Sequence, residues 1–218
     1  MKNLKNILII QKTSKLSYLI DKYGFDCVRR SPEYEVLKNS MEMHSRNCEK
    51  FSNYLNKYKE SYQVLDIIND NFLDNKIIQN EIQNKRQHDI IFTLGGDGTF
   101  LRAAHYIQNK ETLLIGVNTD SKYSKGFYCP IHAEHFLDNY ENEKNKTFLT
   151  KLIKKEFEEK YLNQIQVELD NNNKYNFIND LYIGEKFMWR ISKYNLMVDD
   201  KNSQILKSSG IIFSTCKN

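Results

Sequence analysis

Residues Asp89–Ala104 read DIIFTLGGDGTFLRAA, and this stretch decides the fold. Its first half is apolar and rich in β-branched side chains, which predicts a buried strand that stops at the glycines. A helical pattern of apolar residues follows, with Thr99 expected as its N-cap. Three of the chain's eight glycines, Gly95, Gly96 and Gly98, lie in the turn, where backbone N–H groups are open to an anion. A strand, a glycine turn and a helix N-terminus in this order predict a phosphate-binding loop.

Asp97 is the unusual residue of this turn. A carboxylate repels phosphate, so Asp97 is expected either to hold a metal ion or to accept a proton from a hydroxyl. An ordinary tight turn with a solvated Asp97 is the alternative. Two common phosphate loops are excluded, because the chain has no Walker A consensus and no third glycine follows Gly98 at the spacing of the dinucleotide fingerprint.

The first two thirds of the chain alternate between strand and helix patterns. Strands are expected over residues 6–11, 63–68, 89–94 and 113–117, and helices over residues 44–58, around 77–82 and over 99–109. This alternation predicts an α/β domain over residues 1–143, with a parallel sheet and helices on both faces. Ligands of such sheets bind beyond the carboxyl ends of the strands, so residues 95–99 and 118–120 are expected to share one site.

The pattern changes in the last third of the chain. Short strands are expected over residues 165–169, 176–183, 194–198 and 210–215, separated by Asn- and Asp-containing turns. They predict a β-rich second domain over residues 144–218. Strong helix formers within residues 150–162 leave a helix open as an alternative there.

Composition excludes several classes of protein. The 32 Lys and Arg residues exceed the 28 Asp and Glu residues by too little for a nucleic-acid footprint, and no nucleic-acid partner is expected. No apolar run approaches the length of a membrane span, so no membrane partner is expected either. The four cysteines lack C-x-x-C spacing and no histidine cluster accompanies them, which argues against structural zinc and favours reduced thiols inside a cell.

The glycine turn also carries a family resemblance. Residues 95–101, GGDGTFL, with the alanines that follow at positions 103 and 104, resemble the signature of the NAD kinase family. Residues 114–120, LIGVNTD, resemble the second motif of the family, and residues 124–130 are closest to its mitochondrial-type branch. Lipid kinases share the GGDGT core, but they usually continue with Asn-Glu where this chain has Phe100 and Leu101.

The resemblance extends over nearly the whole chain. Residues 179–185, NDLYIGE, are similar to the Asn-(Glu/Asp) substrate motif of the family, and shorter motifs at residues 190–194, 198–200 and 207–210 follow in the same order. One departure stands out: family members continue after the strand equivalent to residues 210–215 with a glycine-rich turn and further strands. The second domain is therefore expected to be incomplete in this sequence.

This resemblance implies ATP-dependent phosphorylation of the 2′-hydroxyl of the adenosine ribose of NAD, which gives NADP. Gly95, Gly96, Gly98 and Thr99 would bind the phosphates of ATP, and Asp97 would be the catalytic residue that takes the proton from the hydroxyl. The resemblance assigns NAD binding to a set of five residues, namely Asp97, Gly98, Asn118, Asn179 and Asp180. Asn118 suits a strand-end turn equally well. Mg²⁺ would accompany ATP as the cofactor, and no residue is assigned as a metal ligand.

Two other functions stay open at this point. One is a related lipid or sugar-phosphate kinase of the same superfamily, and the other is a non-catalytic nucleotide-binding remnant, which the incomplete second domain would favour. The family also implies a homo-oligomer, a dimer if the full second domain exists. A cytoplasmic location is expected, with a mitochondrial one as the alternative.

Overall fold

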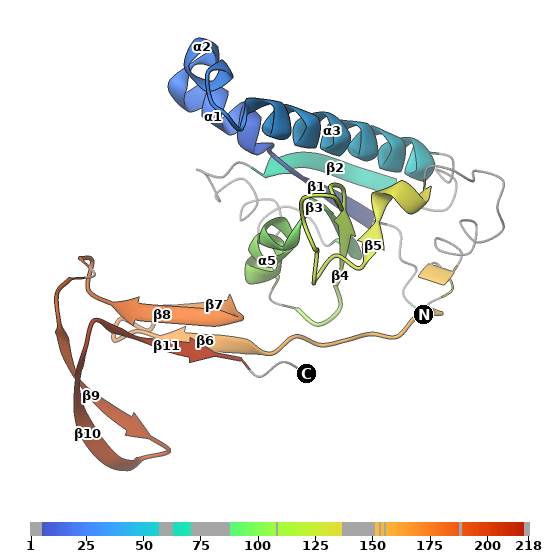
Figure 1. Cartoon of the computed structure of the whole chain (residues 1–218). Coiled ribbons are helices and arrows are strands. Elements are labelled where there is room, and N and C mark those ends of the chain that lie inside the picture. Colours follow the sequence, from blue (N-terminus) through green and yellow to red (C-terminus); the bar gives the residue numbers. More distant parts are fainter. Residues whose placement is uncertain are drawn as a thin grey trace. The chain divides into compact units, whose positions relative to one another are not determined.

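The computed structural model describes residues 6–56, 63–70, 88–107, 109–136, 151–152, 154, 156–187 and 189–215, without the side chains of 63–70, 106, 135–136 and 202–203. The chain divides into two compact units, Met1–Glu158 and Glu159–Asn218 (Figure 1). The domain boundary predicted at residues 143/144 lies outside the described residues and stays a prediction.

A five-stranded parallel sheet forms the centre of the first unit. Its order is β2-β1-β3-β4-β5, made of β2 (Gln63–Asp70), β1 (Asn6–Lys12), β3 (Ile90–Gly95), β4 (Leu113–Asn118) and β5 (Ile131–His132). All six residues of β3 are buried, as expected for a central strand that is covered on both faces. The four predicted strands are confirmed, and the two-residue β5 is an addition.

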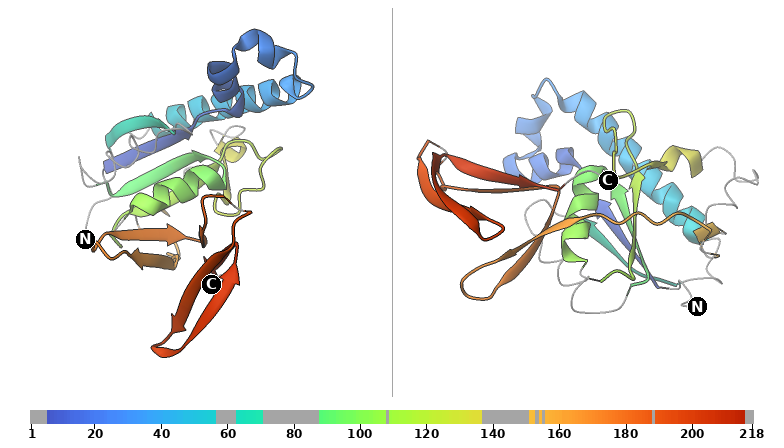
Figure 2. Two further views of the ribbon diagram at one scale, coloured as in Figure 1. Left: turned by 90° about the vertical axis from the view of Figure 1, so that its left-hand side faces the viewer. Right: turned by 90° about the horizontal axis from the view of Figure 1, so that it is seen from below.

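Helices cover both faces of this sheet, as predicted (Figure 2). Successive residues of a strand point to opposite faces, so β1 supplies two cores. On one face Ile7 and Ile9 pack with the long helix α3 (Tyr34–Asn56), which contributes Phe51 and Leu55. On the other face the remaining apolar residues of β1 pack with Ala103 of α5 (Asp97–Tyr106).

The helices before β2 differ from the prediction in extent. The helix expected over residues 44–58 begins earlier, at Tyr34, and two unpredicted helices precede it, α1 (Lys15–Tyr23) and α2 (Phe25–Arg29). The backbone N–H of Ser17 donates to Ser14 Oγ at 3.0 Å and caps α1. The helix expected around residues 77–82 lies outside the described residues. A 3₁₀ turn, η2 (Ala133–Phe136), follows β5.

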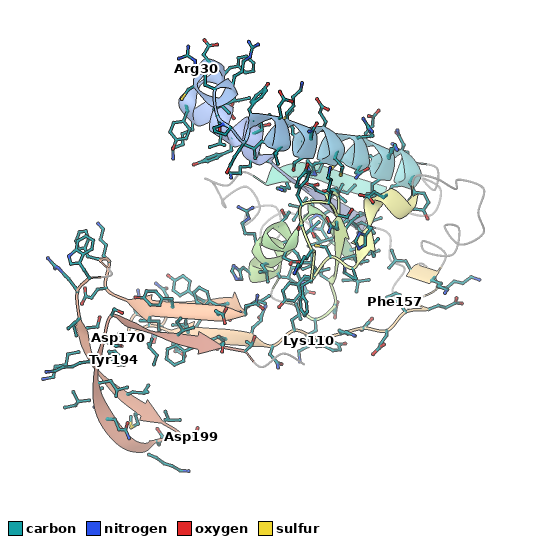
Figure 3. The ribbon with its side chains drawn as sticks, in the orientation of Figure 1. Arg30, Lys110, Phe157, Asp170, Tyr194 and Asp199 are labelled. Atoms are coloured by element: carbon teal, nitrogen blue, oxygen red, sulfur yellow. The ribbon has the colours of Figure 1, made fainter. Side chains whose placement is uncertain are left out.

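The second unit consists of three antiparallel strand pairs. They are β6 (Gln164–Glu168) with β7 (Lys174–Ile178), β8 (Asp180–Gly184) with β11 (Gly210–Ser214), and β9 (Ser192–Val198) with β10 (Lys201–Ser208). Asp199 and Asp200 join β9 to β10 with positive φ angles at both positions, the sign of a type I′ turn (Figure 3). The prediction of a β-rich second part is confirmed.

Two details of that prediction need correction. The single strand expected over residues 176–183 is wrong, because Asn179 has a φ of 70° and ends β7 before β8 begins. Asn tolerates this left-handed conformation better than most residues do. The helical alternative for residues 150–162 is wrong for its second half. Residues 151, 152 and 154 are helical, whereas residues 156–163 are not.

Candidate active site at the glycine turn

The turn between β3 and α5 has the predicted order of strand, glycines and helix, with one correction. The N-cap of α5 is Gly96 rather than Thr99, which is the third residue of the helix and is buried. Thr99 N–H donates to the carbonyl of Gly96 at 3.1 Å. No side chain caps this helix N-terminus. An uncapped N-terminus offers its first backbone N–H groups to an anion.

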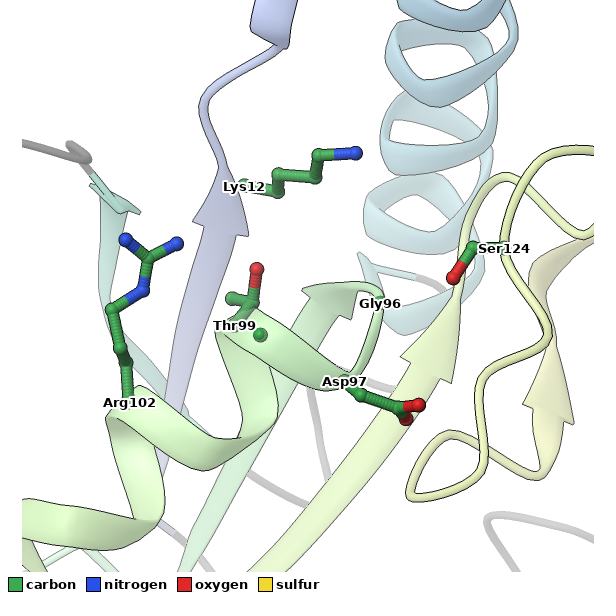
Figure 4. A pocket seen from close by; sticks show the side chains of 7 residues that line it. Lys12, Gly96, Asp97, Thr99, Arg102 and Ser124 are labelled. Atoms are coloured by element: carbon green, nitrogen blue, oxygen red, sulfur yellow. The ribbon is translucent and has the colours of Figure 1, made fainter. Parts of the chain in front are cut away.

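A cavity of about 260 Å³ opens beside this N-terminus (Figure 4). Its lining combines the glycine turn with three residues that the sequence analysis did not assign to the site: Lys12 at the end of β1, Arg102 on α5 and Ser124 in the loop after β4. The full lining is Lys12, Gly96, Asp97, Gly98, Thr99, Arg102 and Ser124. Two cations and two hydroxyls around a helix N-terminus form a set of groups that suits phosphate oxygens.

Close packing explains two of the three glycines. A Cβ at Gly95 would lie 2.8 Å from Thr99 Oγ1 and 2.9 Å from Lys12 Cβ, and a Cβ at Gly96 would lie 2.7 Å from Ser124 Oγ. At Gly98 a Cβ would meet no atom within 4 Å. Gly95 is therefore required by the close packing of the turn, a side chain at Gly96 would have to displace the Ser124 hydroxyl, and Gly98 leaves open space at the pocket.

Asp97 lies on the other side of the turn from the cations. Its side chain points toward the loop after β4, away from Arg102 (Figure 4). Asp97 Oδ2 accepts a hydrogen bond from the N–H of Phe127 at 2.9 Å, and Oδ1 accepts one from the N–H of Tyr128 at 2.7 Å. Each carboxylate oxygen keeps a second lone pair, so it can still accept a hydrogen bond from a hydroxyl.

The same loop is held in two further ways. The ring of Tyr128 stacks on the ring of Phe100 with centroids 5.2 Å apart. Asn118, which is buried, donates from Nδ2 to the carbonyl of Ser124 at 2.9 Å and accepts at Oδ1 from the N–H of Asp120 at 3.0 Å. Both ends of the Asn118 amide are thus used within its own loop, and Asn118 does not line the cavity. It holds the segment that carries Ser124.

The remaining predicted site residues belong to the second unit. Asn179 lies in the turn between β7 and β8, where its carbonyl accepts a hydrogen bond from the N–H of Thr215 at 2.8 Å. Asp180 is the first residue of β8 and is exposed. Their assignment to NAD stays a prediction.

Cys129 is a buried thiol under the electrostatic influence of Asp97, and it is not a nucleophile. Burial raises the pKa of Cys129 to about 12, and the negative charge of Asp97 adds to the shift. A thiol with this pKa stays protonated at neutral pH, and the thiolate is the reactive form. Within the described part of the chain, no three His, Cys, Asp or Glu side chains are grouped as a metal site.

The sequence held signals that could have assigned two of the missed lining residues, Lys12 and Arg102, to the site. Lys12 is the last residue of the first strand, at the edge of the sheet where the glycine turn was expected. Arg102 follows Thr99 by three positions and therefore shares its face of the helix. Ser124 begins the motif at residues 124–130, but only the fold of the loop after β4 brings it beside Gly96.

No helix among the described residues is long and apolar enough to cross a membrane.

Known proteins resemble the chain over the same region. The family model "ATP-NAD kinase N-terminal domain" matches residues 8–157. The NAD kinase of Clostridium tetani is 26% identical over 161 residues, covering 70% of this chain and 55% of that protein. The mitochondrial NAD kinase 2 of Rattus norvegicus is 21% identical over 255 residues, covering 96% of this chain and 57% of the relative.

The human mitochondrial NAD kinase 2 matches equally, at 21% identity over 96% of this chain and 55% of its own length. The chain thus spans a little more than half the length of these relatives. The family match covers more than half of the chain and includes most of β1, the glycine turn and the loop after β4. The chain therefore belongs to the NAD kinase family.

Proposed function

We propose that this protein transfers the γ-phosphoryl group of ATP to the 2′-hydroxyl of the adenosine ribose of NAD, giving ADP and NADP. The observation that carries the proposal is the cavity at the uncapped N-terminus of α5, which has cations on one side and the Asp97 carboxylate on the other. Membership of the NAD kinase family supports the choice of substrates.

The cationic side of the cavity is assigned to the phosphates of ATP. Phosphoryl transfer depends chiefly on positioning and on neutralising charge. Lys12 and Arg102 supply the positive charge, Thr99 and Ser124 supply hydroxyl donors, and the turn at Gly96 supplies backbone N–H groups. Gly95 contributes by allowing the close packing of Lys12 against Thr99.

Mg²⁺ is the cofactor of this proposal. Among the described residues, Asp97 is the only carboxylate in the lining, and both of its oxygens already accept backbone N–H groups. These residues fit a metal that is held mainly by nucleotide phosphates and water, which is how Mg²⁺ is usually bound in phosphoryl-transfer sites. When bound, it would neutralise charge on the phosphates.

Asp97 is assigned to the activation of the phosphoryl acceptor, the ribose 2′-hydroxyl of NAD. A lone pair of its carboxylate takes the proton of the ribose 2′-hydroxyl while the hydroxyl oxygen forms its bond to the γ-phosphorus, and the bond to the ADP oxygen breaks. The two backbone N–H donors from residues 127 and 128 fix the orientation of the carboxylate. Gly98 leaves space beside it for the ribose. Of the other residues that the family resemblance assigns to NAD, Asn179 and Asp180 are proposed as direct contacts, and Asn118 would act through the loop that it holds.

Charge-removing variants test this assignment. NADP formation from ATP and NAD is measured for the wild type, Lys12→Met, Arg102→Met and the control Lys110→Met, whose residue is exposed and outside the cavity. Loss of one charge-assisted hydrogen bond is worth roughly 1.5–3 kcal/mol, so each cavity variant should raise the apparent KM for ATP about tenfold or more. If the wild type phosphorylated a lipid or a sugar phosphate instead of NAD, the assignment of NAD as the phosphoryl acceptor would be wrong.

Three further assignments are part of the proposal. They are a homo-oligomeric state, which the family resemblance implies, a cytoplasmic location with a mitochondrial one as the alternative, and the absence of nucleic-acid partners, which the charge balance predicts. The oligomeric state is the one most easily measured, by light scattering of the purified protein.

A further inference from the structure

One face of α3 is polar where it contacts two segments that carry lining residues of the phosphate cavity. Ser40, His44 and Asn47 are spaced by four and three residues, so they lie on the same face of the helix. Together they form the α3 polar seam. The seam contacts two segments that contribute lining residues from different strands: the end of β1, which carries Lys12, and the loop after β4, which carries Ser124.

His44 links these two segments directly. Its Nε2 lies 2.8 Å from the carbonyl oxygen of Lys12, and its Nδ1 lies 2.7 Å from Thr119 Oγ1. A carbonyl only accepts hydrogen bonds, so Nε2 carries the proton and donates it. Nδ1 then accepts the hydroxyl of Thr119. His44 is buried, and both nitrogens of its neutral ring are satisfied.

The other two seam residues hold the same loop. Asn47 Nδ2 donates to the carbonyl of Thr119 at 2.9 Å, and Ser40 Oγ donates to Asp120 Oδ2. Asn47, Thr119 and Asp120 are all buried. Hydrogen bonds in such a dry environment are costly to break, because the groups left behind have no water to replace the lost partner.

The imidazole is a rigid spacer between the two segments. Its two ring nitrogens are a fixed distance apart, so the Lys12 carbonyl and the Thr119 hydroxyl are held at a fixed separation. Lys12 reaches the cavity from one of these segments, and Ser124 follows Thr119 on the other. A change at residue 44 would therefore shift phosphate-binding groups that it does not touch.

We propose that His44 is a positioning residue for phosphate binding, which sets the separation between Lys12 and the loop that carries Ser124. This inference rests on the proposed function only in taking the ligand of the cavity to be a polyphosphate. His44 contacts the backbone of Lys12 and the side chain of Thr119, not the phosphate. Misplacement of a binding group by a fraction of an ångström is enough to weaken an oriented site.

The test measures binding of inorganic tripolyphosphate to the whole protein by calorimetry. His44→Leu removes both hydrogen bonds and should weaken binding about tenfold, the scale of one lost buried hydrogen bond. His44→Gln can restore a donor toward the Lys12 carbonyl and should recover most of the affinity. Thr119→Val removes only the hydroxyl and should weaken binding several-fold, by a smaller factor than His44→Leu.

Leu55→Ala is the matched control, because Leu55 is a buried residue of the same helix that packs in the core away from the cavity. It should lower the melting temperature and leave tripolyphosphate affinity unchanged. Unchanged affinity in both His44→Leu and Thr119→Val overturns the inference, and so does an equal loss in Leu55→Ala. If His44→Leu does not fold, Thr119→Val decides alone, and unchanged affinity in Thr119→Val then overturns the inference.

The proposed function can fail separately from this inference. A wild type that binds tripolyphosphate through His44 but makes no NADP from NAD and ATP keeps the positioning role and loses the reaction. A wild type that binds no tripolyphosphate overturns the positioning role as well, because no phosphate site would then exist for His44 to order.

Discussion

Asp97 combines two tasks in one side chain, since it anchors residues 127 and 128 and is proposed to accept the ribose proton. Asp97→Asn should lower kcat by about 10²-fold or more, the usual scale for loss of a general base. An amide nitrogen would also face a backbone N–H, so stability should fall by about 1 kcal/mol. Turnover and thermal unfolding measure the two effects separately. Turnover close to that of the wild type would show that Asp97 only anchors the loop.

Asp180 tests the acceptor side of the proposal. Asp180→Ala should raise the apparent KM for NAD about ten- to a hundredfold, the value of a hydrogen bond from a ribose hydroxyl to a charged partner. The apparent KM for ATP should stay similar. Asp180 is exposed at the start of β8, so its replacement should leave the melting temperature nearly unchanged. A parallel rise in both KM values would contradict a specific contact with NAD.

The pH dependence of stability should report on His44. Burial lowers the pKa of His44, the charge of Lys12 lowers it further, and the hydrogen bond to the Lys12 carbonyl and the charge of Asp120 oppose the shift. The Cys48 thiol, 3.6 Å from the ring, stays neutral because burial raises its pKa to about 12. In the unfolded chain His44 titrates near its ordinary pKa of about 6.5.

A histidine whose folded pKa lies below its unfolded pKa binds protons more readily after unfolding. Its stabilising effect is therefore complete above about pH 6.5 and is lost as the pH falls toward the folded pKa. The melting temperature of the wild type should fall more steeply than that of His44→Gln between about pH 7 and pH 5. His105, whose pKa burial also lowers, is present in both proteins and cancels in the comparison. Parallel curves would contradict the neutral, buried His44.

At the scale of elements, the loop after β4 depends on one glycine. Gly126 has a φ of 64°, and a Cβ there would lie 2.6 Å from Asn118 Nδ2. Gly126→Ala should destabilise the protein by about 1–2 kcal/mol or more, because it adds a left-handed alanine and a clash with the residue that holds Ser124.

Gly98→Ala is the matched control. A Cβ at Gly98 meets no atom, and alanine is the better helix former, so the unfolding free energy should not fall. The added methyl group would occupy the space assigned to substrate, and NADP formation should drop. Denaturant unfolding of the two variants checks the contrast, which a similar stability loss in both would contradict.

The sequence predicted the unit of β3, glycine turn and α5 well, because a local pattern specifies it. The apolar run of β3, the glycines and the apolar positions of α5 fix a strand, a turn and a helix without any distant contact. Thr99 was wrongly expected as N-cap, because a hydroxyl near a helix start is a common capping signal and here Gly96 takes that position without a side chain. The break at Asn179 was missed for a similar reason, since its strand-like neighbours hide one left-handed residue.

The contacts of His44 were outside the reach of any local pattern. His44 is 32 positions from Lys12 and 75 positions from Thr119 in the sequence. A histidine in a helix is compatible with many partners, and only the fold selects these two. The positions of Lys12 and Ser124 in the cavity also depend on the tertiary fold, because the parallel sheet brings the ends of β1 and β4 to one edge.

At the scale of the whole molecule, the two units differ in how their strands are buried. The central strands of the first unit are covered by helices on both faces and carry fully buried side chains such as Leu8, Phe92 and Leu94. On β9 and β10, Met197 and Ile205 are exposed by 60% and 69%. Two-stranded ribbons without a covered apolar face are marginally stable in water.

Amide hydrogen exchange of the whole protein should therefore separate the units. The amides of β1 and β3 should exchange only through global unfolding, whereas those of β9 and β10 should exchange through local opening and be the first to label. Because stability against local opening follows buried apolar contact, the difference should persist at every denaturant concentration below the main transition. Equal protection of β9 and β3 would mean that the exposed faces of β9 and β10 are covered in solution. Dilution would then identify a second copy of the chain as the cover, because only an intermolecular contact loses protection as the protein concentration falls.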